Sequence, residues 1–259
     1  MPIPGEPVWM ELTTTDANKA TTFYGELFGW SFHDQGEDFG HYQIISQGGV
    51  DIGGAMVKQS EWGEMPDSFA LYLNTPDIGA STTAVREAGG TVIVEPMAIG
   101  DQGSMAFYLD STGAAIGAWQ GAGRVGMAKQ GMFQTSWFEL MTKHYEAALD
   151  FYPQVFGASL AAMHDPAAGP GEVWNYSTIG EGEQAAAGIC DASAFLPEQV
   201  PSYWRVYVSV PDVDETIATL TSLGGRVLDG PIDSPFGRLA TVADDQGAMF
   251  QVITPPKRG

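Results

Sequence analysis

The sequence repeats itself, and this repeat limits the range of folds more than any other feature of the chain. The segment WMELTTTDANKATTFYGELFGW, which begins at Trp9, returns from Trp137 as WFELMTKHYEAALDFYPQVFGA. Further on, TPDIGASTTAVREAGG is answered by VPDVDETIATLTSLGG, and LDSTGAA by ADDQGAM. Because a long-period repeat marks a repeated structural unit, the sequence predicts two homologous halves. We place them at residues 1–121 and 133–259, joined by a linker at 122–132 that is rich in glycine and other small residues.

Each half is predicted to contain one shorter unit twice. In this unit an apolar strand leads to a turn residue, then to an amphipathic helix, and then to two or three short strands. The favoured N-cap types Asp and Thr place the four helix starts at Asp16, Asp77, Thr142 and Asp212. Runs such as SFALYLNT, MAFYLD and RVYVSV are typical of strands. The sequence therefore predicts an α+β chain of four βαβββ modules, at about residues 7–58, 67–121, 133–191 and 201–255.

The charge balance excludes several classes of partner. Acidic residues number 32 and basic residues 11, which gives a formal net charge of −21. A surface of this kind repels phosphate backbones and anionic lipids, so we expect neither a nucleic acid nor a membrane as partner. The first residues, MPIPGEP, lack the features of a signal peptide, and Cys190 is the single cysteine. We therefore expect a cytoplasmic protein without an internal disulfide.

With these motifs in place, the chain resembles the vicinal oxygen chelate superfamily, which includes glyoxalase I, bleomycin resistance proteins and extradiol dioxygenases. It looks most like the tandem two-domain branch often labelled glyoxalase-like or hydroxylase-like. The resemblance rests on FY-xx-LFGW up to Trp30, FY-xx-VFG up to Gly157, GG-xVxxxP from Gly89 and Gly224, and D-xx-GA at Asp110 and Asp244. It implies two tandem domains, in which pairs of modules form a cup from curved mixed sheets. Ligands, and in catalytic members a divalent metal ion, lie inside the cup.

The positions that hold the metal in this superfamily are not metal ligands here. The resemblance places them on the first and last strands of each module, where catalytic members carry His, Gln or Glu. The first-strand positions correspond to Trp9, Ala70, Trp137 and Arg205, and the last-strand positions fall near Gly53, Gly117, Ala187 and Gln251. Gln251 alone offers a donor atom, and the histidines, His33, His41, His144 and His164, are scattered along the chain. We therefore expect no metal ion and no other cofactor.

Three charged residues are expected to face the cups. Side chains alternate between the two faces of a strand, so Glu11 shares a face with Trp9, and Glu139 shares one with Trp137. A buried carboxylate of this kind suits a general base, and Arg205 suits an electrostatic partner for an enolate or phenolate. These three residues are the candidate catalytic groups. The alternative is a structural role, in which the carboxylates tie strands together and Arg205 forms an ion pair with Glu139.

Aromatic side chains dominate the other predicted cup positions. The first cup would be lined by Trp9, Ala70, Tyr72, Gly117 and Trp119, and the second by Trp137, Trp174, Tyr176, Arg205, Tyr207 and Gln251. Flat aromatic walls with few polar anchors favour planar organic molecules. The alternative for each residue is ordinary core packing. Tyr42 and Tyr176 also correspond between the two halves.

The function predicted from these residues is the binding of a small aromatic or polyketide-like metabolite in metal-free cups. Binding would serve either sequestration or a conversion without a cofactor. One alternative is a metal-dependent lyase or dioxygenase of the glyoxalase or extradiol type, and a second is a non-catalytic interaction protein. The sequence does not decide whether the chain is an enzyme or whether it forms a homodimer. It also leaves open which modules pair to form each cup.

Overall fold

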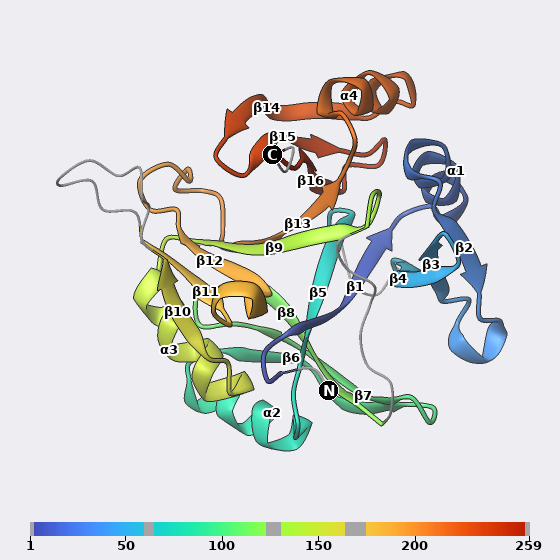
Figure 1. The fold of residues 1–259 in the computed structure, drawn as a ribbon. Helices are drawn as coiled ribbons and strands as arrows, with labels where there is room; N and C mark the ends of the chain where they lie inside the picture. Colours follow the sequence, from blue (N-terminus) through green and yellow to red (C-terminus); the bar gives the residue numbers. More distant parts are fainter. Residues whose placement is uncertain (1–2, 60–64, 123–130, 164–174, 257–259) are drawn as a thin grey trace, which may run out of the picture. The chain divides into compact units, whose positions relative to one another are not determined.

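The computed structural model describes residues 3–59, 65–122, 131–163 and 175–256, and in it one strand–helix–strand unit recurs four times (Figure 1). The first module consists of β1 (Pro7–Thr14), α1 (Ala17–Phe28), β2 (Ser31–Asp34), the short 3-10 helix Glu37–Phe39, β3 (Gln43–Gln47) and β4 (Val50–Val57). The second consists of β5 (Ser68–Asn74), α2 (Ile78–Glu87), β6 (Thr91–Ile99), β7 (Gly103–Leu109) and β8 (Ala115–Gly121). These modules confirm the predicted βαβββ pattern in the first half.

The second half repeats the pattern. The third module consists of β9 (Thr135–Thr142), α3 (Tyr145–Phe156), β10 (Leu160–Met163), β11 (Tyr176–Ile179), the 3-10 helix Gly182–Gln184 and β12 (Ala187–Asp191). The fourth consists of β13 (Tyr203–Ser209), α4 (Val213–Ser222), β14 (Arg226–Ser234), β15 (Gly237–Ala243) and β16 (Met249–Thr254). Most of the predicted linker, 122–132, lies outside the described residues.

The sheets are mixed, as predicted. In every module the first strand pairs in parallel with the last strand, as β1 does with β4 and β9 with β12, and the remaining pairs are antiparallel. The strand order in the first half is β2-β3-β4-β1-β5-β8-β7-β6, and in the second half it is β10-β11-β12-β9-β13-β16-β15-β14. The parallel pairing fixes which residues of the first and last strands lie side by side.

Helix starts follow the sequence signals with one exception. Asp16, Asp77 and Asp212 are N-caps whose carboxylates accept hydrogen bonds from the first turn of α1, α2 and α4. The start of α3 differs from the prediction, because its N-cap is His144 and not Thr142. The Thr142 hydroxyl accepts a hydrogen bond from the backbone N–H of His144 at 3.0 Å, so it stabilises the turn before the helix.

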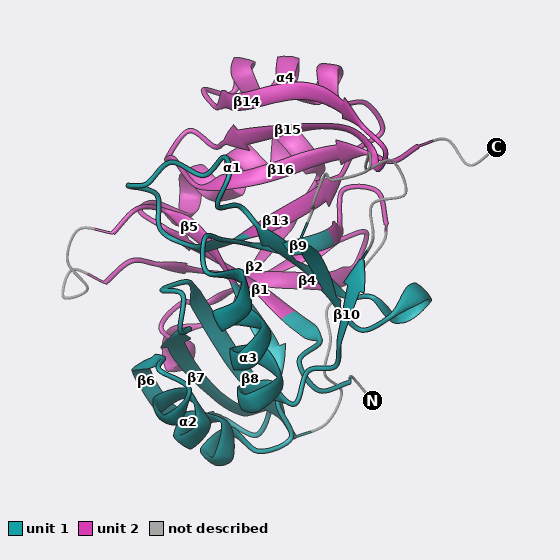
Figure 2. Cartoon of the chain, turned by 90° about the vertical axis from the view of Figure 1, so that its left-hand side faces the viewer, with its two compact units in different colours: residues 1–8, 71–126, 137–204 teal, residues 9–70, 127–136, 205–259 magenta. Residues whose placement is uncertain are grey.

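The chain forms two compact units, and each unit combines modules from both halves (Figure 2). Unit 1 contains residues 1–8, 71–126 and 137–204, and unit 2 contains residues 9–70, 127–136 and 205–259. Apart from strand ends, unit 1 therefore joins the second and third modules, and unit 2 joins the first and fourth. Within unit 1, α2 packs on α3, and the Ser81 hydroxyl donates to the Val155 carbonyl at 2.7 Å.

A buried tyrosine–aspartate hydrogen bond joins the two modules in each unit. In unit 2 the Tyr24 hydroxyl donates to Asp244 at 2.9 Å, and in unit 1 the Tyr152 hydroxyl donates to Asp110 at 2.6 Å. Burial, followed by the charge of the aspartate, raises the pKa of both tyrosines well above the usual value, so both remain donors. The FY and D-xx-G motifs, far apart in the sequence, therefore meet in space.

Removing one of these hydroxyls is expected to destabilise the fold moderately. Tyr24→Phe leaves an oxygen of the buried Asp244 without its donor, so the free energy of unfolding should fall by about 1–2 kcal/mol. Chemical denaturation followed by circular dichroism measures this change. Tyr145→Phe, at a half-buried tyrosine bonded to Ser177, is the control and should cost clearly less. Equal losses in the two variants would contradict the role given to the Tyr24–Asp244 contact.

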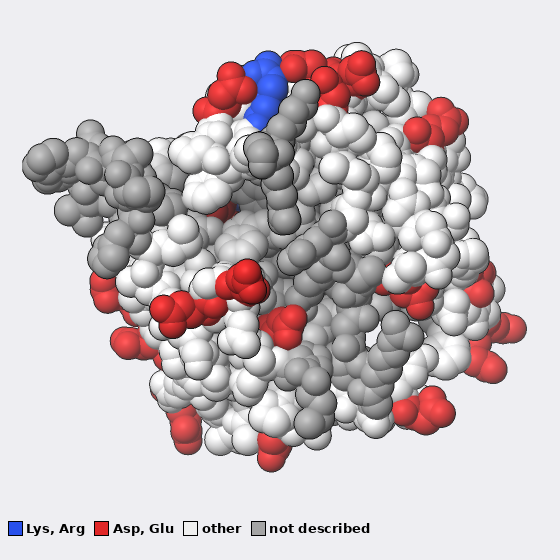
Figure 3. Space-filling model, in the orientation of Figure 1, with Lys and Arg blue, Asp and Glu red and all other residues white. Residues whose placement is uncertain are grey.

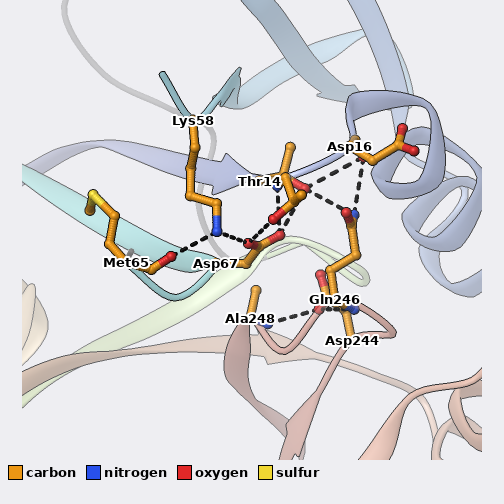
Figure 4. A network of polar contacts seen from close by, with 9 residues as sticks. Thr14, Asp16, Lys58, Met65, Asp67, Asp244, Gln246 and Ala248 are labelled. Carbon is orange, nitrogen blue, oxygen red and sulfur yellow. Dashed lines mark hydrogen bonds and ion pairs between the residues drawn. The ribbon is translucent and has the colours of Figure 1, made fainter. Parts of the chain in front are cut away.

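A second polar cluster in unit 2 is built around the buried carboxylate of Asp67 (Figure 4). Asp67 forms an ion pair with Lys58 at 2.6 Å and accepts hydrogen bonds from the hydroxyls of Thr14 and Thr15, at 3.1 and 2.7 Å. The backbone N–H of Thr15 adds a bond of 2.8 Å. The Gln246 amide donates to the Thr14 hydroxyl at 2.9 Å, so the cluster links the first module to the fourth. We refer to it below as the Asp67 cluster.

Two further properties are the length of the helices and the distribution of charge on the surface. No helix among the described residues is long and apolar enough to cross a membrane. Acidic side chains are spread over the face shown in Figure 3, where basic side chains are sparse, as the net charge of −21 requires.

Candidate functional site

In each module the first strand pairs in parallel with the last strand. This pairing places one residue of the first strand beside one residue of the last strand, at a position that is equivalent in all four modules. The Cα partners in these pairs are Glu11 with Gly54, Tyr72 with Gly117, Glu139 with Gly188, and Tyr207 with Gln251. The last-strand positions in the first and third modules are thus Gly54 and Gly188, one residue beyond the predicted Gly53 and Ala187. A shift of one residue moves a side chain to the opposite face of the sheet, so Gly53 and Ala187 belong to the other face.

Glycine at three of these positions makes room for a tyrosine ring. A Cβ atom on Gly54 would lie 2.0 Å from the hydroxyl oxygen of Tyr42, and one on Gly188 would lie 1.8 Å from that of Tyr176. A Cβ atom on Gly117 would lie 2.2 Å from the ring of Tyr72. Contacts this short leave no room for a Cβ atom at the three positions unless the tyrosine ring moves. They are occupied by aromatic rings from neighbouring strands.

The residues at the superfamily's metal positions do not fit a divalent cation. The equivalent positions on the last strands are three glycines and Gln251, and the amide oxygen of Gln251 already accepts a hydrogen bond from Thr241 at 2.9 Å. Within 3–59, 65–122, 131–163 and 175–256, no three His, Cys, Asp or Glu side chains gather at one place. A divalent cation needs several oxygen or nitrogen donors, but the last-strand positions supply one amide. Glu11, the carboxylate on a first strand of the same unit, accepts a hydrogen bond from Tyr42.

In the first module, a hydrogen-bonded chain runs from Trp9 through Tyr42 to Glu11. The Trp9 indole N–H donates to the Tyr42 hydroxyl at 2.8 Å, and that hydroxyl donates to a carboxylate oxygen of Glu11 at 3.0 Å. Burial, followed by the nearby charge of Glu11, raises the pKa of Tyr42 well above its usual value. The tyrosine therefore stays protonated and holds the buried carboxylate in a fixed place. This chain is called the Trp9–Tyr42–Glu11 chain below.

The third module repeats the first part of this arrangement. The Trp137 indole N–H donates to the Tyr176 hydroxyl at 3.0 Å, and Tyr176 is buried over Gly188. Glu139 occupies the position equivalent to Glu11 and is half-buried. Cys190 is buried in a cluster with Met141 and Tyr176.

The second and fourth modules carry different residues at these positions. In the second, buried Tyr72 lies against Phe107, with ring centres 5.9 Å apart, and Trp119 on β8 is partly buried. In the fourth, Tyr207 is buried beside Gln251, and Arg205 is half-buried two residues before Tyr207. Gln251 is completely buried, and its amide nitrogen has no hydrogen-bond partner among the described residues.

The units group the predicted site residues differently from the two predicted cups. Unit 2 contains Trp9, Glu11, Ala70, Arg205, Tyr207 and Gln251, whereas unit 1 contains Tyr72, Gly117, Trp119, Trp137, Glu139 and Tyr176. Trp174 and His164 lie outside the described residues. The catalytic and binding roles of all these residues stay predictions. Sequence reasoning missed Thr241 and the central place of Tyr42, although the correspondence of Tyr42 with Tyr176 was visible in the sequence.

Two of the histidines and Lys143 have structural partners. Exposed His41 lies 2.9 Å from Asp34, and the His33 ring lies 3.1 Å from the Ser46 hydroxyl. A surface cleft of about 380 Å³ in unit 1 lies at the start of α3 and is lined in part by Lys143. The Lys143 ammonium group donates to three backbone carbonyls, those of Pro197, Glu198 and Val200. Its charge therefore stabilises a loop of the protein.

Comparison with known proteins adds a family match and several relatives. The model of the Glyoxalase/Bleomycin resistance protein/Dioxygenase superfamily matches residues 7–117 and 134–252. A Mycobacterium tuberculosis protein with the provisional name glyoxylase CFP32 is 35% identical over 97% of this chain and 95% of its own length. The anthracycline biosynthesis protein DnrV of Streptomyces peucetius is 31% identical over 96% of this chain and 93% of its own.

Solved structures with low sequence identity share the fold. The Mn(II)-bound glyoxalase from Novosphingobium aromaticivorans matches with a TM-score of 0.64 and 14% identity, over 98% of this chain and 83% of that chain. The 2,3-dioxygenase LapB from Pseudomonas sp. KL28 matches with a TM-score of 0.65 and 11% identity, over 100% of this chain and 95% of that chain. At such identities the likeness concerns the backbone architecture.

Proposed function

The chain belongs to the Glyoxalase/Bleomycin resistance protein/Dioxygenase superfamily, and from this premise we propose that it binds a small aromatic or polyketide-like metabolite without a metal ion. The observation that carries this proposal is the replacement of the metal-ligand positions by glycines with tyrosine rings packed over them. The superfamily's architecture is kept, while its donor set is lost. What is left at these positions is aromatic surface with a few polar anchors, which suits a flat organic molecule.

The relatives support a metabolite of this kind. DnrV and DauV, which match over 96% of this chain, are both named as anthracycline biosynthesis proteins. Anthracyclines are built on fused aromatic rings that carry carbonyl and hydroxyl oxygens. We extend to this chain the chemical class, a flat oxygenated aromatic compound, and not a particular compound. Nucleic acids and membranes remain outside the proposed partners, because the net charge of −21 opposes both.

Binding would serve sequestration or a conversion that needs no cofactor. In the second case Glu11 is the better placed general base of the two glutamates, because the Trp9–Tyr42–Glu11 chain fixes its orientation. Glu139 remains the second candidate base and Arg205 the candidate electrostatic partner. Recovery of the bound compound with both its mass and its chromatographic retention unchanged supports sequestration, whereas a product of different mass or different retention that is lost in Glu11→Gln supports conversion.

The binding proposal predicts saturable quenching of tryptophan fluorescence by oxygenated aromatic compounds. Titration with a panel of soluble hydroxynaphthoquinones and hydroxyanthraquinones should give at least one dissociation constant below about 1 mM. Trp9→Phe keeps an aromatic ring but removes the donor to Tyr42, so this variant should bind more weakly. Absence of saturable binding across the panel would contradict the proposal.

Metal analysis separates this proposal from the metal-dependent alternative. The protein is purified without chelator or affinity tag, and bound metal is measured by mass spectrometry. We expect well under one divalent ion per chain, because the last-strand positions supply one amide and the Glu11 carboxylate is bonded to Tyr42. A stoichiometric amount of Mn, Fe, Ni or Zn would favour the lyase or dioxygenase alternative.

A further inference from the structure

The side-chain amide of Gln251 has hydrogen-bonding capacity that the protein itself does not use. Gln251 lies in the middle of β16, and its side chain is completely buried. Its oxygen accepts a hydrogen bond from the Thr241 hydroxyl at 2.9 Å, but its nitrogen has no partner among the described residues. A buried amide nitrogen without an acceptor lowers the stability of the free protein. Such a group is expected where a ligand supplies the missing acceptor.

The position of Gln251 on the sheet is that of a ligand-facing residue. Its neighbour Phe250 packs among Tyr24, Phe28 and Phe69, with ring centres 5.8–6.0 Å apart, and so lies on the face that packs against α1. Alternation along the strand directs Gln251 to the opposite face. Tyr207, its Cα partner on β13, shares that face. An aromatic ring and an amide donor therefore lie side by side.

The arrangement occurs in one module only. The positions equivalent to Gln251 are Gly54, Gly117 and Gly188, which have no side chain and are covered by tyrosine rings. The fourth module thus differs from the other three in the side chain at this structurally equivalent position. A donor at one position out of four predicts one selective site per chain, in unit 2.

We propose that Gln251 donates a hydrogen bond to a carbonyl or phenolate oxygen of the bound aromatic compound. This inference rests on the proposed function and narrows it to aromatic ligands that carry an acceptor oxygen, such as quinones. Thr241 acts as a positioning residue, because its hydroxyl engages the amide oxygen and leaves the amide nitrogen for the ligand. Tyr207, the Cα partner of Gln251 on β13, supplies an aromatic ring on the same face of the sheet.

Two soluble probes of the same size test the inference. Anthraquinone-2-sulfonate and anthracene-2-sulfonate share the three-ring skeleton, the sulfonate and its charge, and they differ in the central ring, where carbonyl groups of the quinone replace two aromatic C–H groups. In titrations followed by tryptophan fluorescence and by calorimetry, the wild-type protein should bind the quinone about tenfold more tightly, with a stoichiometry of one. The part of this preference that is lost when the donor is removed is the part that comes from the acceptor oxygen.

A double variant removes the donor without leaving a new unpaired group. Thr241→Val with Gln251→Met replaces both partners by apolar side chains of similar size. We expect this variant to bind the two probes with equal affinity and to have a melting temperature equal to or above that of the wild type, since no buried polar atom remains unpaired there. If the double variant does not fold, the single variant Gln251→Met takes its place in the same comparison.

The outcomes separate the inference from the function on which it rests. If both probes bind the wild type with equal affinity, the inference is wrong while the proposed binding function stands. If the variant keeps the preference for the quinone, the inference is also wrong, because the donor lies elsewhere. If neither probe binds below about 1 mM, the proposed function fails and the inference fails with it.

Discussion

Replacing Asp67 with alanine is expected to lower the free energy of unfolding by about 3 kcal/mol or more. The substitution removes the carboxylate at the centre of the Asp67 cluster and leaves Lys58, Thr14 and Thr15 without their shared acceptor. Because Asp67 is buried, water does not replace it freely. Urea denaturation measures the loss. The control is Asp51→Ala, at an exposed aspartate on β4, which should change stability by less than about 0.5 kcal/mol.

The same cluster predicts how stability depends on pH. Burial by itself would raise the pKa of Asp67, but the ion pair with Lys58 and the hydrogen bonds from Thr15 and Thr14 outweigh it, so the pKa is lowered. A carboxyl group whose pKa is lower in the folded state stabilises the fold at pH values above its unfolded pKa, about 3.9. This contribution is lost as the pH falls through the folded value. The stability gap between wild type and Asp67→Asn should therefore shrink below about pH 4.

Adding one methyl group at Gly54 is expected to disrupt the first module's site. In Gly54→Ala the new Cβ would lie 2.0 Å from the Tyr42 hydroxyl oxygen, so the ring must move. Its movement breaks the Trp9–Tyr42–Glu11 chain, and we expect a loss of about 1–3 kcal/mol in stability. The affinity for the quinone probes should fall about tenfold, because the proposed function places Trp9 and Glu11 at the ligand.

Gly25→Ala is the matched control for this substitution. Gly25 lies within α1, and the nearest atom to a Cβ there is a backbone oxygen at an ordinary 3.6 Å. Alanine is favoured over glycine inside a helix, so this variant should be more stable than the wild type by about 0.5–1 kcal/mol. Two glycine-to-alanine changes in one unit are thus expected to act in opposite directions. A neutral outcome at Gly54 would show that Tyr42 can shift without cost.

Local sequence signals predicted the modules well because they depend on neighbours in the chain. The Asp N-caps at Asp16, Asp77 and Asp212 and the strand runs were found in this way, and the structure confirms them. His144 replaced Thr142 as the cap of α3 because a threonine can stabilise a turn from outside the helix as well as cap it. Composition alone does not separate these two roles.

Features that depend on pairing between distant segments could not be predicted. Gly54 and Gly188 lie opposite the two glutamates because of the register in which β4 pairs with β1 and β12 pairs with β9. The β3–β4 pairing contains an irregularity, so counting residues along the sequence does not give the position on β4 to within one residue. The meeting of Tyr24 with Asp244 was hidden for the same reason, since the sequence left the pairing of modules open. The orphaned nitrogen of Gln251 depends on its full three-dimensional surroundings.

The two tyrosine–aspartate bonds also bear on the origin of the chain. Tyr24 and Asp110 belong to the first half of the sequence, and Tyr152 and Asp244 belong to the second, yet each tyrosine bonds the aspartate of the other half. Two identical copies of a single half would make both bonds with each other. End-to-end fusion of a symmetric dimer would produce this exchange of bonds. A fused chain also lets each half carry different residues, as glutamine at one position and glycine at its three counterparts show.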